Sequence, residues 1–218
     1  MKSIGLIHSP FKEKFSIPRQ PGLTSLTSTI ELSPPFDRSE ALAGLELFSH
    51  VWVIFLFHET NSTDEKSLSV RPPRLGGNQK QGVFATRSPF RPNNIGLSLV
   101  KILKIDGTKI LIEGGDFLDQ TPLLDLKPYL PSVESIPEAT GGWTDRTCDQ
   151  NLEVLFENNS DCDIDKEIIK SIREVLSLDP RPSYHKDEYK NYGSKLFNYD
   201  VHWLVKNRKI HVTEIIRL

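Results

Sequence analysis

Short apolar runs, each closed by proline or glycine, fill the first half of this 218-residue chain and constrain its fold more than any other feature. Runs of this length between turn residues are typical of β-strands. Strands are therefore expected at residues 4–7, 27–32, 51–57, 82–86, 97–105 and 109–113. Asp106-Gly107 joins the last two runs, which predicts a tight hairpin. Many short strands favour a sheet that curls or closes, so we expect a mostly β fold with a compact β-barrel-like N-terminal domain.

Little helix is expected in this half, and a second domain is expected after it. Asp37 or Ser39 can cap a helical turn or two through Leu45, with Gly44 closing it. Residues 128–142 hold three prolines and two glycines, which break helices and strand ladders. We place the boundary there, giving a β-barrel domain at 1–135 and a small α+β domain at 136–218.

The second domain has its own pattern of strands and helix. Residues 152–156 are expected to form a strand. Apolar residues from Ile164 to Leu176 recur at helical spacing after Asp163, the expected cap. Residues 199–205 and 210–216 are expected to pair, with Val201, Trp203 and Val205 on one face.

Composition excludes several classes of protein. Hydrophobic residues make up 37% and charged residues 26%, which is typical of a folded globular chain. The longest apolar run, residues 51–57, is too short to span a membrane, and no secretory leader is visible, so a cytoplasmic location is expected. Cys148 and Cys162 form no close-spaced pair, so neither a metal site nor a disulfide scaffold is expected. The common glycine-rich nucleotide-binding, metalloprotease and serine-hydrolase motifs are absent.

Charge is unevenly distributed although the net charge is only −2. Residues 71–105 contain seven basic and no acidic side chains, which suits a phosphate or polyanion, although a solvated basic face has the same signature. Residues 132–167 contain ten acidic side chains against two basic ones and should stay off nucleic acid.

Three loops at 18–22, 71–77 and 87–93 combine proline with arginine and with glycine, glutamine or asparagine. Proline fixes a backbone, glycine permits close approach of a ligand, and arginine offers a fork of donors to phosphate or carboxylate. The loops are therefore candidate binding elements, or they are simply turns between strands. His58 and Glu59, at the end of the most apolar strand, are either ligand contacts or satisfied rim residues.

Aspartates and aromatic residues give two further candidate groups. Asp116, Asp119 and Asp125 flank Thr121-Pro122-Leu123-Leu124 and either accept a hydrogen bond from an amine or cap turns. Near the C-terminus, aromatic and basic residues alternate, a mixture that suits single-stranded RNA unless the aromatics are buried. That mixture comprises Arg181, Tyr184, His185, Lys186, Tyr189, Lys190, Tyr192, Lys195, Phe197 and Tyr199.

These segments together resemble the TrmO-like tRNA methyltransferases. The resemblance rests on ordered motifs that span residues 1–131: Ser9-Pro10-Phe11-Lys12, Pro18-Arg19-Gln20-Pro21-Gly22, Phe57-His58, Arg71-Pro72-Pro73-Arg74-Leu75-Gly76-Gly77, Gly82-Val83-Phe84-Ala85-Thr86-Arg87-Ser88, Arg91-Pro92-Asn93, Ile95-Gly96 and Thr121-Pro122-Leu123-Leu124-Asp125. Asp179-Pro180-Arg181-Pro182 followed by Tyr184 extends it into the tail. The sequence departs from the family at Asn94, where proline is usual, and at Gln120, where glycine is common.

The resemblance implies an enzyme that uses S-adenosylmethionine to methylate N6 of threonylcarbamoyl-adenosine at position 37 of threonine tRNA. It also implies a β-barrel fold and a homodimer. Cofactor contacts are expected at Pro18, Arg19, Gln20, His58, Glu59, Arg87, Leu97, Asp119, Gln120, Thr121 and Pro122. Asp119 and His58 are the candidates for accepting a proton. A non-catalytic RNA- or nucleotide-binding barrel and a small-molecule methyltransferase are the alternatives.

The substrate side is expected to be cationic. Arg71, Arg74 and Arg91 are candidates for binding the threonyl carboxylate or the flanking phosphates, because charge-assisted hydrogen bonds to such groups are strong. Arg181 and Tyr184 are the candidate tRNA contacts in the tail.

Overall fold

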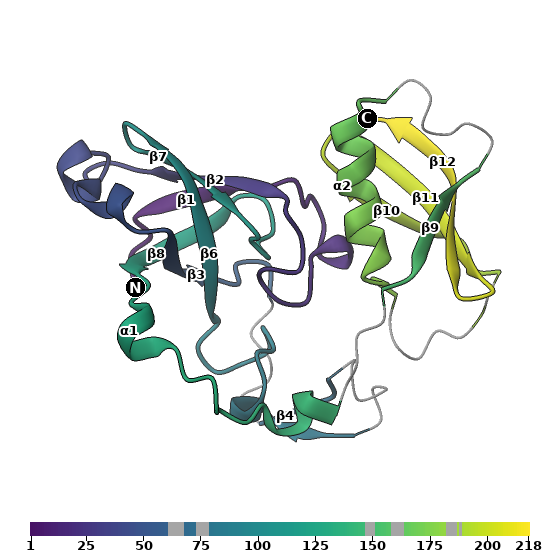
Figure 1. Cartoon of the computed structure of the whole chain (residues 1–218), viewed down its shortest axis with the longest axis horizontal. Helices are drawn as coiled ribbons and strands as arrows, with labels where there is room; N and C mark the ends of the chain where they lie inside the picture. The colour runs from purple at the N-terminus through teal and green to yellow at the C-terminus, as the bar shows by residue number, and fades with distance from the viewer. Residues whose placement is uncertain (61–67, 73–78, 147–150, 158–163, 182–186, 188) are drawn as a thin grey trace.

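A computed structural model describes residues 1–60, 68–72, 79–146, 151–157, 164–181, 187 and 189–218. Figure 1 shows two bodies side by side, a β-barrel and a smaller unit of one helix and a sheet. This arrangement is the mostly β barrel with an α+β C-terminal unit that the sequence predicts. No helix among the described residues is long and apolar enough to cross a membrane.

Six antiparallel strands close the barrel in the order β1-β2-β7-β6-β3-β8. Inward-facing apolar residues alternate along them, so that Ile30, Val53 and Ile110, for example, are fully buried. The strands are β1 (Gly5–His8), β2 (Thr27–Leu32), β3 (His50–Leu56), β6 (Ile95–Asp106), β7 (Lys109–Glu113) and β8 (Thr121–Pro128). The predicted hairpin joins β6 and β7, with Gly107 at the positive φ of +60° that such a turn requires.

The expected strand at 82–86 is wrong. Only β5 (Gln81–Gly82) is extended, and it pairs with β4 (Ser69–Val70) in a separate ribbon. A 3-10 turn, η5 (Val83–Ala85), follows because the Thr86 amide and hydroxyl both donate to the carbonyl of Val83. Arg87, which follows this turn, therefore lies outside any β-strand.

The expected helix near residue 40 is also different. Two 3-10 turns, η2 (Ser39–Leu42) and η3 (Leu45–Leu47), replace it. Gly44 lies between them at a φ of +88° and interrupts the helix rather than ending it. Strand β8 was not predicted, because Pro122 and the charged residues Asp125 and Lys127 hide its alternation.

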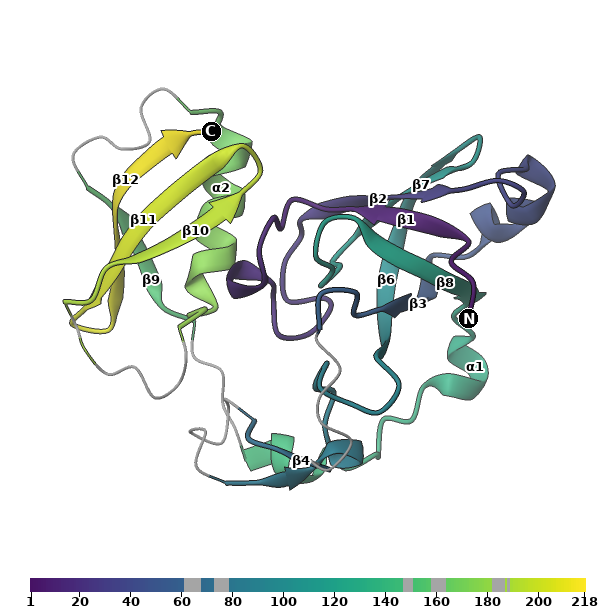
Figure 2. The same ribbon diagram turned by 180° about the vertical axis from the view of Figure 1, so that it is seen from behind.

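The second body is a four-stranded sheet, ordered β10-β11-β12-β9, with α2 against it (Figure 2). Its elements are β9 (Glu153–Phe156), α2 (Lys166–Ser177), β10 (Tyr192–Leu196), β11 (Tyr199–Lys206) and β12 (Lys209–Arg217). As expected, Val201, Trp203 and Val205 are buried together. The cap of α2 is Asp165, whose side chain accepts from the Glu167 amide at 2.8 Å; Asp163 lies outside the described residues. Between the bodies, residues 131–146 form only the short helix α1 (Pro131–Glu134) and the 3-10 turn η6 (Gly142–Arg146).

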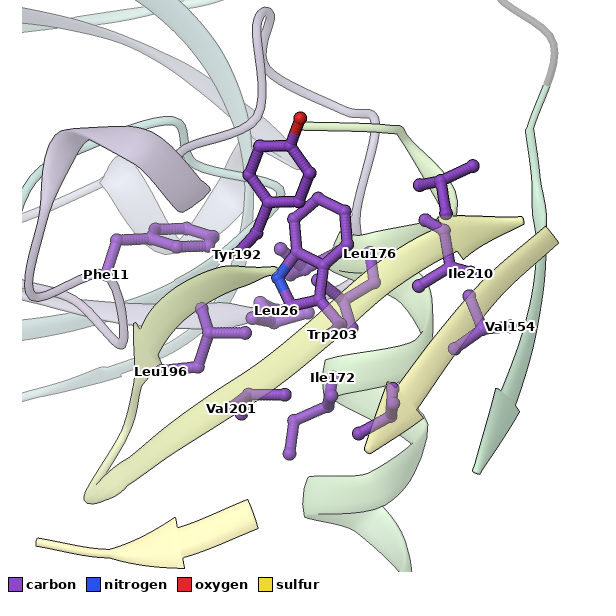
Figure 3. Close-up of a cluster of buried hydrophobic side chains, with 13 residues drawn as sticks. Phe11, Leu26, Val154, Ile172, Leu176, Tyr192, Leu196, Val201, Trp203 and Ile210 are labelled. Atoms are coloured by element: carbon purple, nitrogen blue, oxygen red, sulfur yellow. The ribbon is translucent and has the colours of Figure 1, made fainter. Parts of the chain in front are cut away.

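The core of this second body includes side chains from the N-terminal segment that follows β1. Figure 3 shows Phe11 and Leu26 beside Tyr192, Leu196 and Trp203. Phe11 is fully buried and pairs with Leu196 through an isolated β-bridge. The two bodies therefore share a packed interface, which fixes the loop between β1 and β2 against the α+β domain.

Aromatic side chains of the tail divide between core and surface. Tyr192 is buried and stacks on Trp203, with ring centroids 4.8 Å apart, and on Phe15 of η1 (Lys14–Ser16) at 6.1 Å. Tyr189, by contrast, is exposed. For Tyr192 the buried alternative therefore holds, and Phe197 and Tyr199 are partly buried against the same core, so the aromatic share of the proposed RNA-binding mixture is reduced.

Candidate active site

A cavity of about 710 Å³ opens where the loop after η1, the end of β3 and the start of β6 meet. Its volume lies within the range of about 300–1,000 Å³ that small-molecule sites occupy. The structure brings together nine residues that the sequence singled out as binding candidates: Pro18, Arg19, Gln20, His58, Glu59, Arg87, Arg91, Leu97 and Thr121. Residues far apart in the chain thus converge on one site.

The pairing of β3 with β6 positions one wall of the cavity. Phe55 lies opposite Gly96 in the ladder, and a Cβ atom at Gly96 would collide with the Phe55 ring. That ring packs edge-on against Phe57 and Phe117, at centroid distances of 5.1 and 4.9 Å. Gly96 is therefore required by the close approach of the ring that forms one wall of the cavity.

Asn94 holds the rim that carries His58 and Glu59. Its side-chain Nδ2 donates to the carbonyl of Thr60 at 3.2 Å, and its own carbonyl accepts from the Phe57 amide at 2.8 Å. A proline at this position has no such donor. The departure from the family pattern thus adds a hydrogen bond that fixes the segment after β3.

Three polar side chains link the loop at 18–20 to the other walls. Arg87 Nη1 donates to Gln20 Oε1 at 3.0 Å. Arg19 Nη2 donates to the backbone carbonyls of Asp179 and Arg181, at 3.0 and 3.2 Å. Burial lowers the pKa of Arg19, and the charge of Asp179 opposes that shift. The cavity wall is therefore fastened to the α+β domain through Arg19.

Asp116 also lines the cavity, although the family resemblance points to Asp119 rather than to this residue. It follows β7 and is partly buried. Ser98 on β6, itself buried, donates its hydroxyl to Asp116 Oδ1 at 2.5 Å. Burial raises the pKa of Asp116 to about 6, against the opposing effects of the Ser98 hydrogen bond and the Arg87 charge. Only the position of Asp116 in the closed barrel, which is not visible in the sequence, distinguishes it.

Asp119, Gln120 and Pro122 lie beside the cavity lining rather than in it. Lys12 Nζ binds Asp119 Oδ2 at 2.6 Å, and the Ser9 amide donates to Oδ1 at 2.9 Å. Burial alone would raise the pKa of Asp119, but these hydrogen bonds and the charge of Lys12 lower it. Pro122 pairs with Leu6 in the barrel. These residues hold the turn that leads to Thr121.

Gln120 adopts a φ of +62°, the left-handed region that favours glycine. Its side chain contacts His8, with 2.8 Å between Nε2 and Nδ1. Glycine, which is common in the family at this position, adopts such a φ without strain. Gln120 adopts it at a cost in backbone strain, which its hydrogen bond with His8 offsets.

A second cavity of about 1190 Å³ adjoins the first and shares Arg19, Gln20, Thr86, Arg87, Pro89 and Phe90 with it. Arg71 lines it, together with the aromatic side chains of Phe84 and Trp143. The Trp143 indole donates to the carbonyl of Ala85 at 2.8 Å, which fixes the ring. Cationic and aromatic groups thus lie directly beside the first cavity.

The remaining substrate candidates are placed differently. Arg91 lines the first cavity and donates to the carbonyl of Thr86 at 3.3 Å. Arg181 makes two hydrogen bonds to the Asp179 carboxylate, at 2.8 and 2.9 Å, so its guanidinium already has a partner. Arg74 and Tyr184 lie outside the described residues. Within those residues, no group of three or more metal-ligating side chains occurs.

The structure thus defines a two-domain protein in which a closed barrel carries a cavity of small-molecule size, next to a second cavity with cationic and aromatic lining, and an α+β unit packs against the barrel. Residues 6–135 match the model of the tRNA-methyltransferase O N-terminal domain, and residues 149–218 match that of the TrmO C-terminal domain. The chain belongs to the TrmO family.

Individual relatives agree with this membership. A tRNA (adenine(37)-N6)-methyltransferase of Escherichia coli is 40% identical, with 97% of this chain and 95% of the relative covered. A putative S-adenosylmethionine-dependent methyltransferase of Pseudomonas aeruginosa is 44% identical over 92% of this chain and 90% of its own. A crystal structure of TrmO from Pseudomonas aeruginosa superimposes with a TM-score of 0.79 at 35% identity and covers 98% of this chain and 97% of that one.

Proposed function

We propose that this protein is an S-adenosylmethionine-dependent tRNA methyltransferase that methylates N6 of adenine 37. The observation that carries the proposal is the convergence of the 18–20, 58–59 and 87 segments on one cavity of small-molecule size, in a chain of the TrmO family. The near-complete coverage of the Escherichia coli enzyme supports extending its named activity to this chain.

The lining of the first cavity fits S-adenosylmethionine. Phe57, Phe90 and Leu97 provide apolar surface for an adenine ring, while Glu59 provides a carboxylate for a ligand that carries an ammonium and a sulfonium. Arg19 or Arg87 suits its carboxylate. When bound there, the cofactor supplies an electrophilic methyl group. We propose that Asp119, Gln120 and Pro122 contribute by shaping the turn before Thr121.

The second cavity suits the acceptor nucleotide. Phe84, Phe90 and Trp143 offer aromatic faces on which an unpaired base can stack, and each stacked base typically contributes about 1–3 kcal/mol. Arg71 and Arg87 can donate hydrogen bonds to a phosphate or to the carboxylate of a threonylcarbamoyl group. Because the two cavities share lining residues, a base held in the second lies next to the cavity that we assign to the cofactor.

The chain's own contribution to catalysis is mainly alignment. Holding the two reactants at about 3–3.5 Å in a favourable orientation can supply about 7–11 kcal/mol of the barrier. The hydrogen bonds of Arg19, Gln20 and Arg87 fix the loop at 18–20 relative to the other segments that line the cavity. No covalent nucleophile is needed for methyl transfer to a nitrogen.

We further propose threonylcarbamoyl-adenosine 37 in the anticodon loop of threonine tRNA as substrate, and the cytoplasm as the location of the enzyme. We also propose a homodimer. Leu68 is exposed directly before β4, on the side of the barrel where a partner subunit would cover it. Sedimentation analysis at micromolar concentration tests the dimer directly.

Transfer of tritiated methyl groups from S-adenosylmethionine to total tRNA tests the function. The native protein should label tRNA, and Arg87→Ala should reduce the labelling rate at least about 10-fold, because its charge-assisted bonds are lost. Arg38→Ala, a surface change at a residue paired with Glu40, is the matched control and should retain the rate. Binding of the cofactor without any labelling would instead indicate a non-catalytic binding module.

A further inference from the structure

Asp116 occupies a special place among the cavity residues. It follows β7, and its Oδ1 accepts the Ser98 hydroxyl at 2.5 Å from the adjacent strand β6. Ser98 is almost completely buried, so the hydrogen bond is shielded from solvent and fixes one carboxylate oxygen. The carboxylate lines the cavity that we assign to the methyl donor.

We propose that Asp116 is the proton acceptor of the methyl transfer, held in position by Ser98. The proposal rests on the methyltransferase function proposed above. Asp119 is less suited to this role, because Lys12 and the Ser9 amide bind both of its oxygens beside the cavity rather than within it. The other titratable or charged groups that line the cavity are Lys14, Arg19, His58, Glu59, Arg87 and Arg91.

The step balances with Asp116 as the base. The N6–H bond of the acceptor breaks, and its proton passes to the carboxylate of Asp116. The electron pair on N6 forms the new bond to the methyl carbon. The bond from that carbon to the donor sulfur breaks, and its pair remains on sulfur, which becomes a neutral thioether. The negative charge of Asp116 and the positive charge of the sulfonium are both neutralised, and the proton later leaves to water.

Burial raises the pKa of Asp116 to about 6, whereas the Ser98 hydrogen bond and the nearby Arg87 act in the opposite direction. Near neutral pH the group is therefore ionised but more basic than an ordinary carboxylate, as a general base should be. Loss of the Ser98 hydroxyl removes an effect that favours the charged form. In Ser98→Ala the pKa of Asp116 should rise further.

Two variants and a control test the proposal. Asp116→Asn keeps the size of the side chain and should lower kcat about 100-fold or more, the usual contribution of a general base. Its dissociation constant for S-adenosylmethionine, measured by calorimetry, should change by less than about 3-fold. Asp106→Asn, an exposed carboxylate in the β6–β7 hairpin, should leave both quantities unchanged.

The second variant separates a base from a binding residue. In Ser98→Ala the acid limb of the kcat profile should move to higher pH, with much of the rate recovered in alkaline buffer. An acid limb set by a group that Ser98 does not contact would stay unchanged when the Ser98 hydroxyl is lost. Without substrates, the carbon-13 resonance of the Asp116 carboxyl, identified by its absence in Asp116→Asn, should titrate near pH 6 and move upward in Ser98→Ala.

Three results would overturn the assignment. One is an active Asp116→Asn enzyme with native kcat. Another is a loss of cofactor affinity large enough to account for the loss of rate. The third is a Ser98→Ala profile and carboxyl resonance that titrate as in the native protein. Absence of methyl transfer by the native protein would instead contradict the proposed function, and the carboxyl titration would still report on the Asp116–Ser98 pair.

Discussion

Arg19 joins the proposed cofactor cavity to the α+β domain, since its Nη2 lies 3.0 Å from the backbone carbonyl oxygen of Asp179. The same nitrogen reaches the carbonyl of Arg181 at 3.2 Å. The segment that carries both carbonyls is itself closed by the bidentate pair of Arg181 with Asp179. A wall of the cavity is thus positioned by a domain that lies more than 150 residues further along the chain.

Arg19→Lys should weaken cofactor binding although it keeps the positive charge. The lysine side chain ends one bond short of the position of Arg19 Nη2, so the two carbonyls lose their partner. Hydrogen bonds from charged groups are typically worth about 1.5–3 kcal/mol, and the free energy of unfolding should fall by an amount in that range. Calorimetric binding of S-adenosylmethionine and urea unfolding measure the two effects. Equal affinity and stability in the variant would show that the Arg19 contacts with the tail are unimportant.

Gly96→Ala should close the cavity. The added methyl group would collide with the Phe55 ring, and overpacking of this kind typically costs about 1–3 kcal/mol. Cofactor binding should be lost while the barrel still folds. Gly82→Ala is the matched control, because no atom lies near the added Cβ there. If Phe55→Leu does not restore binding to Gly96→Ala, the collision is not the cause.

Gln120→Gly should be more stable than Gln120→Ala by about 1 kcal/mol. Both variants lose the contact with His8, but only glycine relieves the positive φ of +62°. The comparison therefore isolates the backbone strain. Thermal and urea unfolding of the pair measure it, and an alanine variant at least as stable as the glycine variant would show that the backbone is unstrained.

Asp116→Asn should stabilise the protein above pH 6. The pKa of the folded carboxyl is about 6, whereas an ordinary value is 3.8. Between those values the folded state holds a proton that the unfolded state has lost, so this group makes the native protein less stable as pH rises through the window. The variant lacks that effect and should exceed the native protein by up to about 3 kcal/mol at pH 8, but by little at pH 4. Urea unfolding at both pH values measures the difference, and a constant difference would contradict the shifted pKa.

The barrel could be predicted from the sequence because most of its strands are short apolar runs between turn residues, a signal that depends only on neighbouring residues. Strands at 27–32 and 109–113 and the Asp106-Gly107 hairpin match the structure to the residue. The predicted strand at 82–86 is instead mostly a 3-10 turn, since two hydrogen bonds from Thr86 to Val83 override the apolar run. Strand β10 was not predicted, because Tyr192 and Lys195 within it belong to the mixture of aromatic and basic residues that is typical of an RNA-binding surface.

The structure brings together the candidate residues that motifs mark, whereas residues that meet only through long-range contacts could not be found from the sequence. The Pro18–Gln20, His58–Glu59 and Arg87 segments were singled out by their composition and do converge. The family resemblance points to Asp119, and only the structure shows that Asp116 lines the cavity while Asp119 is bound by Lys12. Packing of Phe11 into the core of the α+β domain is likewise a long-range contact that no local pattern reveals.

Mapping of the transferred methyl group tests the central claim most directly. The purified protein is incubated with methyl-labelled S-adenosylmethionine and threonine tRNA, with and without the threonylcarbamoyl group on adenosine 37, and the nucleosides are identified by mass spectrometry. The account predicts one added methyl group, on N6 of the modified adenosine, and none on the unmodified tRNA. A methyl group at any other atom, or none at all while the cofactor binds, would contradict it.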